Sequence, residues 1–507
     1  MHFYAKLHIS LCFSVKEGLK NNLQYLTFNI GCDIIDRMYN YKYFVIFLSN
    51  IIQIQKSPFL RQNGEKQMSK FGKVKLPHRK HTADMRDARI PTPNVVVLPM
   101  SQYIGAPAIP IVKVNDKVCV GTKVAEADGK VSAAIHSPVS GTVKKIGDFL
   151  LANGKSCQAI TIESDGEMTM DASITPPTVT NAEELCQAIR ESGLVGLGGA
   201  GFPTANKLEN AIAKSIDTII INGAECEPYI TVDNRTMIDG TENVVKGVEI
   251  IEKYIPGPQN IIIAIENNKP IAIKKMTEAF ANDPKVKVVS LPSEYPQGAE
   301  KTLVYTLLGR IVPDGKLPSD VGCVMFNVTS VAFFTHYLET GIPYTWRMVT
   351  VDGSAVKSPK VVTAPIGTSL RDLLTFCDTD FDNLGKVIYG GPMMGIAAYD
   401  LDAPIYKNTN AILALNIEDS LPKKQHACIH CGKCIAHCPM NLDPTAFVKA
   451  MKIDSREDRA EMLEKENLLS CIECGSCSYV CPSRRPLIEN HKLAKSDLRR
   501  TLAEKKD

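Results

Sequence analysis

The sequence predicts a multidomain protein of mixed α/β and α+β class, and three observations support this. Short β-branched runs broken by Gly, Pro and Asp fill residues 95–165, strand-like and helix-like runs alternate over residues 182–340, and two cysteine-rich repeats lie within residues 428–482. A chain of 507 residues is also long enough for about three or four domains.

The composition is ordinary for a globular protein, with 44% hydrophobic and 22% charged residues. The formal charge of +3 is too small to favour nucleic acid as a partner. Eight of the 16 cysteines belong to the two repeats, and the other eight are scattered without a pairing pattern. This cysteine usage suits a reducing compartment.

Residues 1–67 differ in style from the rest of the chain. Their most apolar run, Tyr41 to Ile54, is about 14 residues long and is interrupted by polar residues, whereas a membrane span needs about 20 apolar residues. Acidic residues precede this run and no small-residue cleavage site follows it, so a signal peptide is not indicated. We expect Met68 to be the natural start and residues 1–67 to be an atypical extension, either mis-called or disordered.

The first predicted domain, residues 68–165, is a small β unit. The run from Asp116 to Glu126, followed by the run from Ile135 to Val143, resembles the biotinyl/lipoyl hammerhead. In that family a lysine at the tip of a hairpin carries the cofactor. The apolar-Lys signature of that tip is missing here, so Lys130 is predicted to be an ordinary turn lysine.

A linker over residues 164–181 precedes the second predicted domain, residues 182–340. Asn181 is the expected N-cap of a helix whose Leu185, Ile189 and Leu194 lie near one face. Runs of β-type composition then alternate with helical segments, which predicts an α/β domain with a largely parallel sheet. These runs are Thr218–Asn222, Asn260–Ile265 and Val286–Ser290.

The last part of the chain divides into three predicted units. Residues 343–400 contain a strand–turn–strand, a helix and another strand, which fits a β-grasp-like module. Residues 420–487 hold the cysteine repeats, with one helix expected between them over about residues 444–469. Residues 488–507 are predicted to be a basic, solvated helical tail, with a partner contact as the alternative.

Each cysteine repeat reads C-x2-C-x2-C-x3-C-P, the run that holds [4Fe–4S] clusters in bacterial-type ferredoxins. In two-cluster ferredoxins the fourth Cys of each run ligates the other cluster. The predicted ligand sets are therefore Cys428, Cys431, Cys434 and Cys481 for one cluster, and Cys471, Cys474, Cys477 and Cys438 for the other. A pair of structural zinc sites is the alternative, but zinc motifs usually supply two C-x2-C pairs per ion.

The second strong feature is a glycine-rich segment, residues 193–201, with five glycines. Missing side chains let backbone N–H groups approach a phosphate or a flat ring, and Lys207 could add a positive charge. The spacing is not the dinucleotide fingerprint, because no strand precedes it. The next strand ends near Asn222, Glu225 and Glu227, where α/β sheets place ligands, although a solvated turn is the alternative.

These motifs and their order resemble known families. The run Gly-Leu-Gly-Gly-Ala-Gly-Phe-Pro-Thr with Lys207, followed by Asn-Gly-Ala-Glu-Cys-Glu-Pro, is similar to the flavin- and NADH-binding subunit of respiratory complex I. The full order of parts over about residues 68–490 resembles the RnfC (RsxC) family, the C subunit of the membrane-bound ion-translocating electron transport complex. A single four-Cys cluster follows in the complex I subunit, so the two repeats favour RnfC.

The resemblance implies particular cofactor-binding residues. Glu227 matches the acid that touches the nicotinamide nucleotide, and Phe202 matches the aromatic residue that stacks on it. A Tyr-x-x-Gly-Glu-Glu turn is matched by Tyr295 and Glu300, with Ala299 replacing the first Glu, and another turn near the flavin retains Asn327 with Ser330 in place of Thr. The remaining implied flavin-site residues are Gly196, Gly198, Gly199, Gly201, Lys207, Asn222 and Glu225.

The resemblance also implies a function, that of an NADH-linked oxidoreductase subunit of a translocase. Nicotinamide exchanges two electrons and clusters accept one, so FMN is expected between NAD(H) and two [4Fe–4S] clusters, and no acid–base catalytic residue is needed. The implied partners are subunits of the RnfA, RnfB, RnfD, RnfE and RnfG types and ferredoxin, with peripheral attachment to the cytoplasmic side of the bacterial inner membrane. The rival hypotheses are a cobalamin reductase of the bacterial-microcompartment type and a non-enzymatic cluster scaffold.

Overall fold

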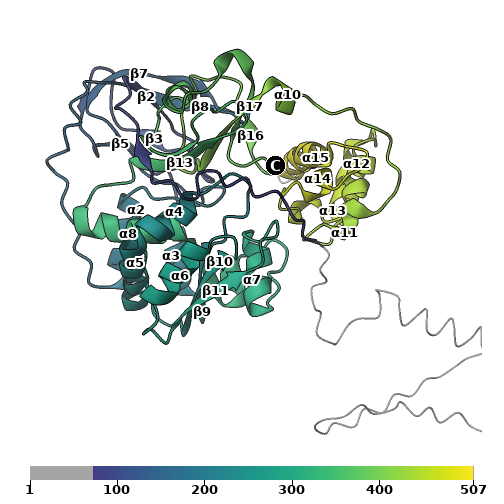
Figure 1. Ribbon diagram of the computed structural model, residues 1–507, viewed down its shortest axis with the longest axis horizontal. Coiled ribbons are helices and arrows are strands. Elements are labelled where there is room, and N and C mark those ends of the chain that lie inside the picture. The colour runs from purple at the N-terminus through teal and green to yellow at the C-terminus, as the bar shows by residue number, and fades with distance from the viewer. Residues whose placement is uncertain (1–71, 506–507) are drawn as a thin grey trace, which may run out of the picture. The chain divides into compact units, whose positions relative to one another are not determined.

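The computed structural model describes residues 72–505 (Figure 1). The predictions for residues 1–67 and for the start at Met68 lie outside the described residues. The described residues belong to one unit of the chain, residues 69–507, and contain four β-sheets. No helix between residues 72 and 505 combines the length and the apolar content that crossing a membrane requires.

The first part is built from two antiparallel sheets, as the short β-branched runs predict. Alternate residues of the longer strands, among them Val96, Leu98, Ile160 and Ile162, are fully buried in the core. The four-stranded sheet has the order β2 (Val95–Pro99), β8 (Ser156–Ser164), β7 (Gly141–Leu150) and β4 (Lys117–Val118). The three-stranded sheet has the order β3 (Ile109–Pro110), β5 (Lys123–Glu126) and β6 (Ile135–His136).

The second part is an α/β unit whose four strands are all parallel, which confirms the prediction from the alternating runs. Their order is β11 (Val286–Leu291), β10 (Asn260–Glu266), β9 (Thr218–Gly223) and β12 (Cys323–Asn327). The helices are α2 (Ala182–Glu191), α3 (Thr204–Ala213), α4 (Val232–Asp239), α5 (Thr241–Tyr254), α6 (Pro270–Ala279), α7 (Glu300–Leu308) and α8 (Val328–Thr340).

The start of α2 is as predicted and its end is not. The Asn181 side chain accepts a hydrogen bond from the backbone N–H of Glu184, which is N-capping geometry. The helix stops at Glu191, so the expected place of Leu194 on the helix face is wrong. The chain turns at Gly193, whose φ of +70° is left-handed, and Leu194 is buried beyond the helix instead.

The third part is a six-stranded mixed sheet that takes strands from distant segments. Its order is β1 (Ala88–Arg89), β14 (Lys360–Pro365), β13 (Trp346–Asp352), β17 (Ala411–Asn416), β15 (Leu384–Tyr389) and β16 (Ile396–Ala397). Two helices accompany it, α9 (Leu370–Phe376) and α10 (Ile417–Ser420). Residues 72–90 lead into this sheet: Val74 exchanges backbone hydrogen bonds with Tyr295, and β1 then pairs with β14.

The C-terminal part is helical, but its helices differ from the prediction. The single helix expected over residues 444–469 is wrong, because Ser455 caps a new helix by accepting from the N–H of Asp458. The helices are α11 (Lys433–Ala436), α12 (Pro444–Ala450), α13 (Arg456–Lys465), α14 (Ser476–Tyr479) and α15 (Leu487–Glu504).

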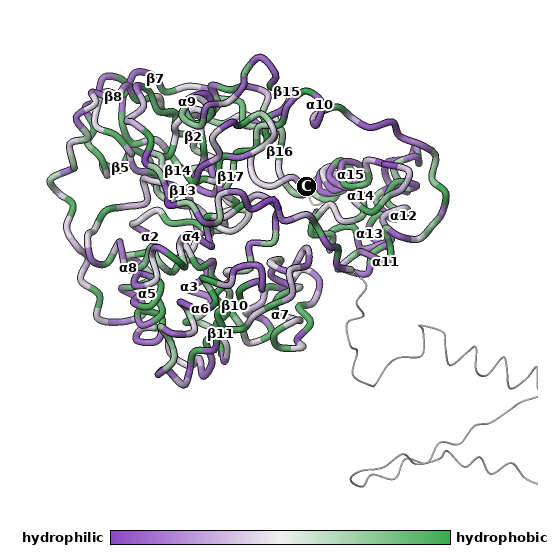
Figure 2. Tube along the Cα trace, viewed as in Figure 1, coloured by the Kyte–Doolittle hydropathy of each residue, from purple (hydrophilic) through white to green (hydrophobic). Residues whose placement is uncertain are grey.

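The last helix, α15, is not simply solvated. Hydrophilic and hydrophobic residues alternate along it (Figure 2), and its apolar face is buried against Phe447 and Leu463 through Ala494 and Leu498. Even Lys495 is buried, where its Nζ donates to the Cys471 carbonyl oxygen and pairs with Glu473 at 2.8 Å. The prediction of a solvated tail, which was based on the basic composition, is therefore wrong. The segment is an amphipathic helix whose apolar face belongs to the core of the C-terminal part.

Candidate functional site

A cavity of about 520 Å³ opens beside the glycine-rich segment. Twelve of the thirteen residues predicted to bind flavin or nucleotide line it: Gly196, Gly198, Gly199, Gly201, Phe202, Lys207, Asn222, Glu225, Glu227, Tyr295, Glu300 and Asn327. Ser330 is the exception. It is buried behind the glycine-rich segment, where its Oγ accepts a hydrogen bond from the N–H of Leu197 at 3.3 Å.

The glycine-rich segment joins α2 to α3 and forms one wall of the cavity. The N–H of Gly196 donates to the carbonyl oxygen of Phe202 at 2.9 Å, which closes the segment into a loop. A Cβ on Gly199 would meet nothing within 4 Å, whereas a Cβ on Gly198 would lie 2.7 Å from the Asn327 amide nitrogen. The bare backbone at Gly199 therefore leaves room for a flat or anionic group.

Lys207 lies on α3, directly after this loop. Its Nζ donates to Glu300 Oε1 at 2.6 Å and to the Met325 carbonyl oxygen at 3.1 Å. The structure thus pairs two predicted site residues that lie 93 positions apart in the chain. A positive charge at this position can attract a phosphate, and Glu300 balances that charge.

The residues after β9 form a half-buried acidic loop, and its two glutamates have structural partners. Glu225 accepts hydrogen bonds from the N–H groups of Asp233, at 2.7 Å, and Asn234, and so holds the start of α4. Burial raises the pKa of Glu225 to about 7. Asn222 donates to the Gly298 carbonyl oxygen at 2.9 Å, which ties the end of β9 to the turn after Tyr295.

Glu227 reaches across to the six-stranded sheet. Its carboxylate accepts hydrogen bonds from the N–H groups of Met393, at 3.1 Å, and Met394, at 2.9 Å, in the turn between β15 and β16. Gly391 permits this approach, because a Cβ there would lie 2.3 Å from Glu227 Oε2. Burial raises the pKa of Glu227 to about 7 despite these two hydrogen bonds.

Sequence reasoning missed the residue that holds the acidic loop. The Nζ of Lys80 donates to three backbone carbonyl oxygens of the loop, those of Glu225 at 2.8 Å, Glu227 at 2.9 Å and Ile230 at 2.5 Å. Lys80 stands among other basic residues with no periodic pattern, so no sequence signal distinguished it. Asp233 was also missed; it lines the cavity and accepts a hydrogen bond from Asn327 at 2.8 Å.

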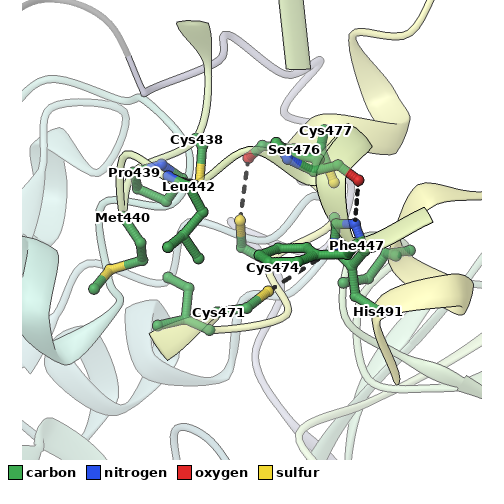
Figure 3. Close-up of a pocket in the computed structure, with 14 residues that line it drawn as sticks. Cys438, Pro439, Met440, Leu442, Phe447, Cys471, Cys474, Ser476, Cys477 and His491 are labelled. Carbon is green, nitrogen blue, oxygen red and sulfur yellow. Dashed lines mark hydrogen bonds between the residues drawn. The ribbon is translucent and has the colours of Figure 1, made fainter. Parts of the chain in front are cut away.

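A second, small cavity of about 20 Å³ gathers cysteines from both repeats (Figure 3). Its lining includes Cys438, Cys471, Cys474 and Cys477, which is the predicted crossed set of three thiols from the second repeat and one from the first. Backbone N–H groups donate to two of these sulfurs, from Leu442 to Cys438 and from Glu473 to Cys471, each at 3.4 Å. Soft sulfur donors that accept N–H bonds fit the ligand set of an iron–sulfur cluster.

The other predicted set is closer to the surface. Cys431 is exposed, Cys428 and Cys481 are half-buried, and Cys434 is buried. Within residues 72–505, no three His, Cys, Asp or Glu side chains stand close enough to hold a single metal ion. The thiolates that hold a [4Fe–4S] cubane bind different iron atoms, so they need not lie as close together as the ligands of a single ion.

The large cavity and the cysteine pocket adjoin each other. Ile472 lines both. Tyr295, which lines the large cavity and is 2% exposed, donates a hydrogen bond through its hydroxyl to the carbonyl oxygen of Cys474 at 2.7 Å. One side chain therefore connects the wall of the cavity with the backbone of a predicted cluster ligand.

Four family models match successive parts of this chain. They are the RnfC barrel sandwich hybrid domain at residues 69–167, the Nuo51 FMN-binding domain at residues 189–336, the SLBB domain at residues 348–397 and the 4Fe-4S dicluster domain at residues 421–483. Together with the adjoining sites, these matches define a redox protein that has an FMN-binding domain and a 4Fe-4S dicluster domain. The chain belongs to the RnfC family, the C subunits of ion-translocating oxidoreductase complexes.

Relatives from three bacteria support this membership. The chain is 43% identical to the C subunit of the proton-translocating ferredoxin:NAD(+) oxidoreductase complex of Clostridium ljungdahlii, over 83% of this chain and 92% of that protein. It is 39% identical to the C subunit of the Na(+)-translocating complex of Acetobacterium woodii, over 84% and 96%. It is 40% identical to the C subunit of the ion-translocating oxidoreductase complex of Pseudomonas aeruginosa, over 80% of this chain and 52% of that protein. The predicted family is thereby confirmed.

Proposed function

We propose that this chain is the NADH-, FMN- and iron–sulfur-dependent subunit of a membrane-bound oxidoreductase complex that couples electron transfer to ion translocation. The substrates would be NAD(H) and ferredoxin-type carriers, as the names of the Clostridium ljungdahlii and Acetobacterium woodii relatives indicate for those proteins. The main observation behind the proposal is that the large cavity and the cysteine pocket adjoin each other. Ile472 lines both, and Tyr295 in the cavity wall donates a hydrogen bond to the Cys474 backbone.

The large cavity is suited to FMN together with a nicotinamide nucleotide. FMN, when bound, exchanges a hydride with NAD(H) and single electrons with clusters. The backbone at Gly199 admits the cofactor, and Lys207 supplies a positive charge for its phosphate. Phe202 offers an aromatic face to the nucleotide, and Glu227 offers a carboxylate held by the turn at Met393. The protein's own part is to orient both molecules and to exclude water.

We propose two [4Fe–4S] clusters with crossed ligands. The set made of Cys438, Cys471, Cys474 and Cys477 adjoins the cavity, because Cys474 accepts the Tyr295 hydrogen bond. The set made of Cys428, Cys431, Cys434 and Cys481 includes an exposed residue, Cys431. This difference in burial supports an order in which the first set serves the flavin and the second serves a partner protein. Cluster potentials depend on surroundings, so either direction of flow is compatible with the chain.

We propose peripheral attachment on the cytoplasmic side of the bacterial inner membrane, with subunits of the RnfA, RnfB, RnfD, RnfE and RnfG types as partners. We also propose that the first part is hammerhead-like and the third part β-grasp-like. The proposed domain limits are 68–165, 182–340, 343–400, 420–487 and 488–507, after an extension over 1–67.

The test is anaerobic purification of the full chain from native membranes, with FMN, iron and sulfide quantified and co-purified proteins identified. We expect FMN, two cubanes, integral membrane partners and NADH oxidation with ferricyanide. Lys207→Ala should weaken FMN binding and leave cluster iron intact. Clusters without flavin or NADH oxidation would support a scaffold instead, and reduction of corrinoids without membrane partners would support a cobalamin reductase.

A further inference from the structure

The carbonyl groups of the glycine-rich loop are bound from outside the cavity. Three side chains that belong to the six-stranded sheet or to the turn before its strand β17 donate to them. Lys407 Nζ donates to the Gly193 oxygen at 2.6 Å, Arg347 Nη2 donates to the Leu197 oxygen at 2.8 Å, and Asn408 Nδ2 donates to the Gly199 oxygen at 3.2 Å. We call these three donors the clamp. Arg347 and residues 406–410 all lie outside the range of the SLBB match.

The clamp is itself rigidly held. Arg347 is 1% exposed, and its Nε donates to the Thr409 carbonyl oxygen at 2.7 Å. The turn is closed by a hydrogen bond from the N–H of Thr409 to the Tyr406 oxygen. The N–H of Lys407 donates to Gln102 Oε1 at 3.1 Å, so the first part of the chain also supports the turn. Arg347 and Lys407 are both buried and hydrogen-bonded on more than one side, which favours one arrangement of their surroundings.

The two glycines at the ends of the loop have left-handed backbone and close neighbours that include clamp residues. A Cβ on Gly193, whose φ is +70°, would lie 2.5 Å from the Ala134 carbonyl oxygen and 2.8 Å from Lys407 Nζ. Gly201 has a φ of +78°, and a Cβ there would lie 3.2 Å from the Tyr103 Cβ and 3.3 Å from the Asn408 Cβ. Both ends of the loop therefore need glycine for their backbone conformation and for this close packing.

Fixing a carbonyl also fixes the N–H group of the same peptide. In a planar trans peptide the C=O of one residue and the N–H of the next point in opposite directions. Binding of the Leu197 and Gly199 oxygens by the clamp therefore turns the N–H groups of Gly198 and Ala200 away from the clamp. Both Gly198 and Ala200 line the cavity.

We propose that Arg347 and Asn408, supported by Lys407, are positioning residues that aim the N–H groups of Gly198 and Ala200 at acceptor atoms of bound FMN. This inference rests on the proposed FMN site. The six-stranded sheet and the turn before β17 would thus position a loop that belongs to the neighbouring α/β unit. Backbone N–H groups of one loop that point in the same direction are a common way of binding an anionic or carbonyl acceptor.

The test compares FMN and riboflavin affinities in the full-length, cluster-loaded protein, measured by quenching of flavin fluorescence. Asn408→Asp keeps the volume and removes the donor, and the loss of one such hydrogen bond should weaken binding about 3- to 10-fold. Arg347→Met should weaken it further. The control is Asn383→Asp, the same change at an exposed residue that does not line the cavity. Weakening for both ligands identifies the ring as the acceptor. Weakening for FMN alone identifies the phosphate if Asn408→Leu, which removes the donor without adding a negative charge, shows the same selectivity.

A second measurement covers the case in which Arg347→Met fails to fold. Amide hydrogen exchange over residues 194–202 should rise in Asn408→Asp and stay at the wild-type level in Asn383→Asp, before any flavin is added. FMN affinity and exchange within two-fold of wild type in Asn408→Asp would overturn the inference and leave the proposed function standing. Failure of the wild-type protein to bind any flavin would instead remove the proposed function, and the inference with it.

Discussion

Replacement of Lys80 by Met tests how the acidic wall of the cavity is held. The Lys80 ammonium has three N–H donors, and each has one acceptor, the carbonyl oxygens of Glu225, Glu227 and Ile230. Methionine has a similar length and no donor. The substitution therefore removes all three hydrogen bonds without leaving a large cavity.

The expected loss of stability follows from the three hydrogen bonds. A hydrogen bond from a charged group contributes about 1.5–3 kcal/mol, so three contribute at most about 4.5–9 kcal/mol. Burial lowers the pKa of Lys80 to about 8, because desolvation of the ammonium offsets part of its favourable interactions. We therefore expect Lys80→Met to lower the free energy of unfolding by about 3 kcal/mol.

The assay is urea unfolding together with hydrogen exchange over residues 224–230 and the KM for NADH. Exchange and KM should both rise, because Glu225 and Glu227 lie on the cavity wall. Lys75→Met is the control, since Lys75 is an exposed lysine of the same segment. Wild-type stability and wild-type exchange in Lys80→Met would show that the loop does not depend on this lysine, and the reasoning would be refuted.

Three further changes test the rest of the site. Cys438→Ser should abolish the same cluster signal as Cys474→Ser in electron paramagnetic resonance, and loss of the signal that Cys431→Ser abolishes would overturn the crossed ligand sets. Burial raises the Glu227 pKa from 4.5 to about 7, so the folded state binds more protons than the unfolded chain between those values and stability falls as pH rises through that window, by about 3 kcal/mol in total; Glu227→Gln should flatten this part of the stability-versus-pH curve, and an unchanged slope would contradict the assignment. Tyr295→Phe removes the hydrogen bond to Cys474 and should cost about 1 kcal/mol of stability. It should slow reduction of the clusters by NADH while NADH oxidation with ferricyanide stays normal, and an equal fall in both rates would place the effect in the cavity itself.

Local patterns in the sequence predicted much of the fold. The parallel sheet followed from β-branched runs that alternate with helical ones, and the Asn181 cap followed from the residue type at the start of an apolar period. The same logic failed at residues 444–469, where charged residues continue through the break and only the Ser455 cap marks it. It failed again at α15, where the many basic residues suggested a solvated helix although one face of the helix is buried.

The site was predictable where its residues stand in short motifs. The glycine-rich loop, the acidic loop and the cysteine repeats each carry their chemistry within about a dozen residues, and the structure brings them together around two adjoining cavities. The residues that hold these motifs were missed. Arg347 contacts a carbonyl 150 positions earlier in the chain, and Lys80 contacts carbonyls about 150 positions later. No local pattern links such pairs.

The sequence by itself determined which chemical groups are available, namely eight thiols at cluster spacing, a bare backbone loop and two glutamates at the end of a strand. Only the tertiary structure decided that Glu227 binds the Met393 turn, that Tyr295 joins the cavity to Cys474, and that the glycine-rich loop is clamped from the neighbouring sheet. The physical reason is range. Spacing within a motif is set by the chain itself, whereas hydrogen bonds between remote segments exist only once packing has brought those segments together.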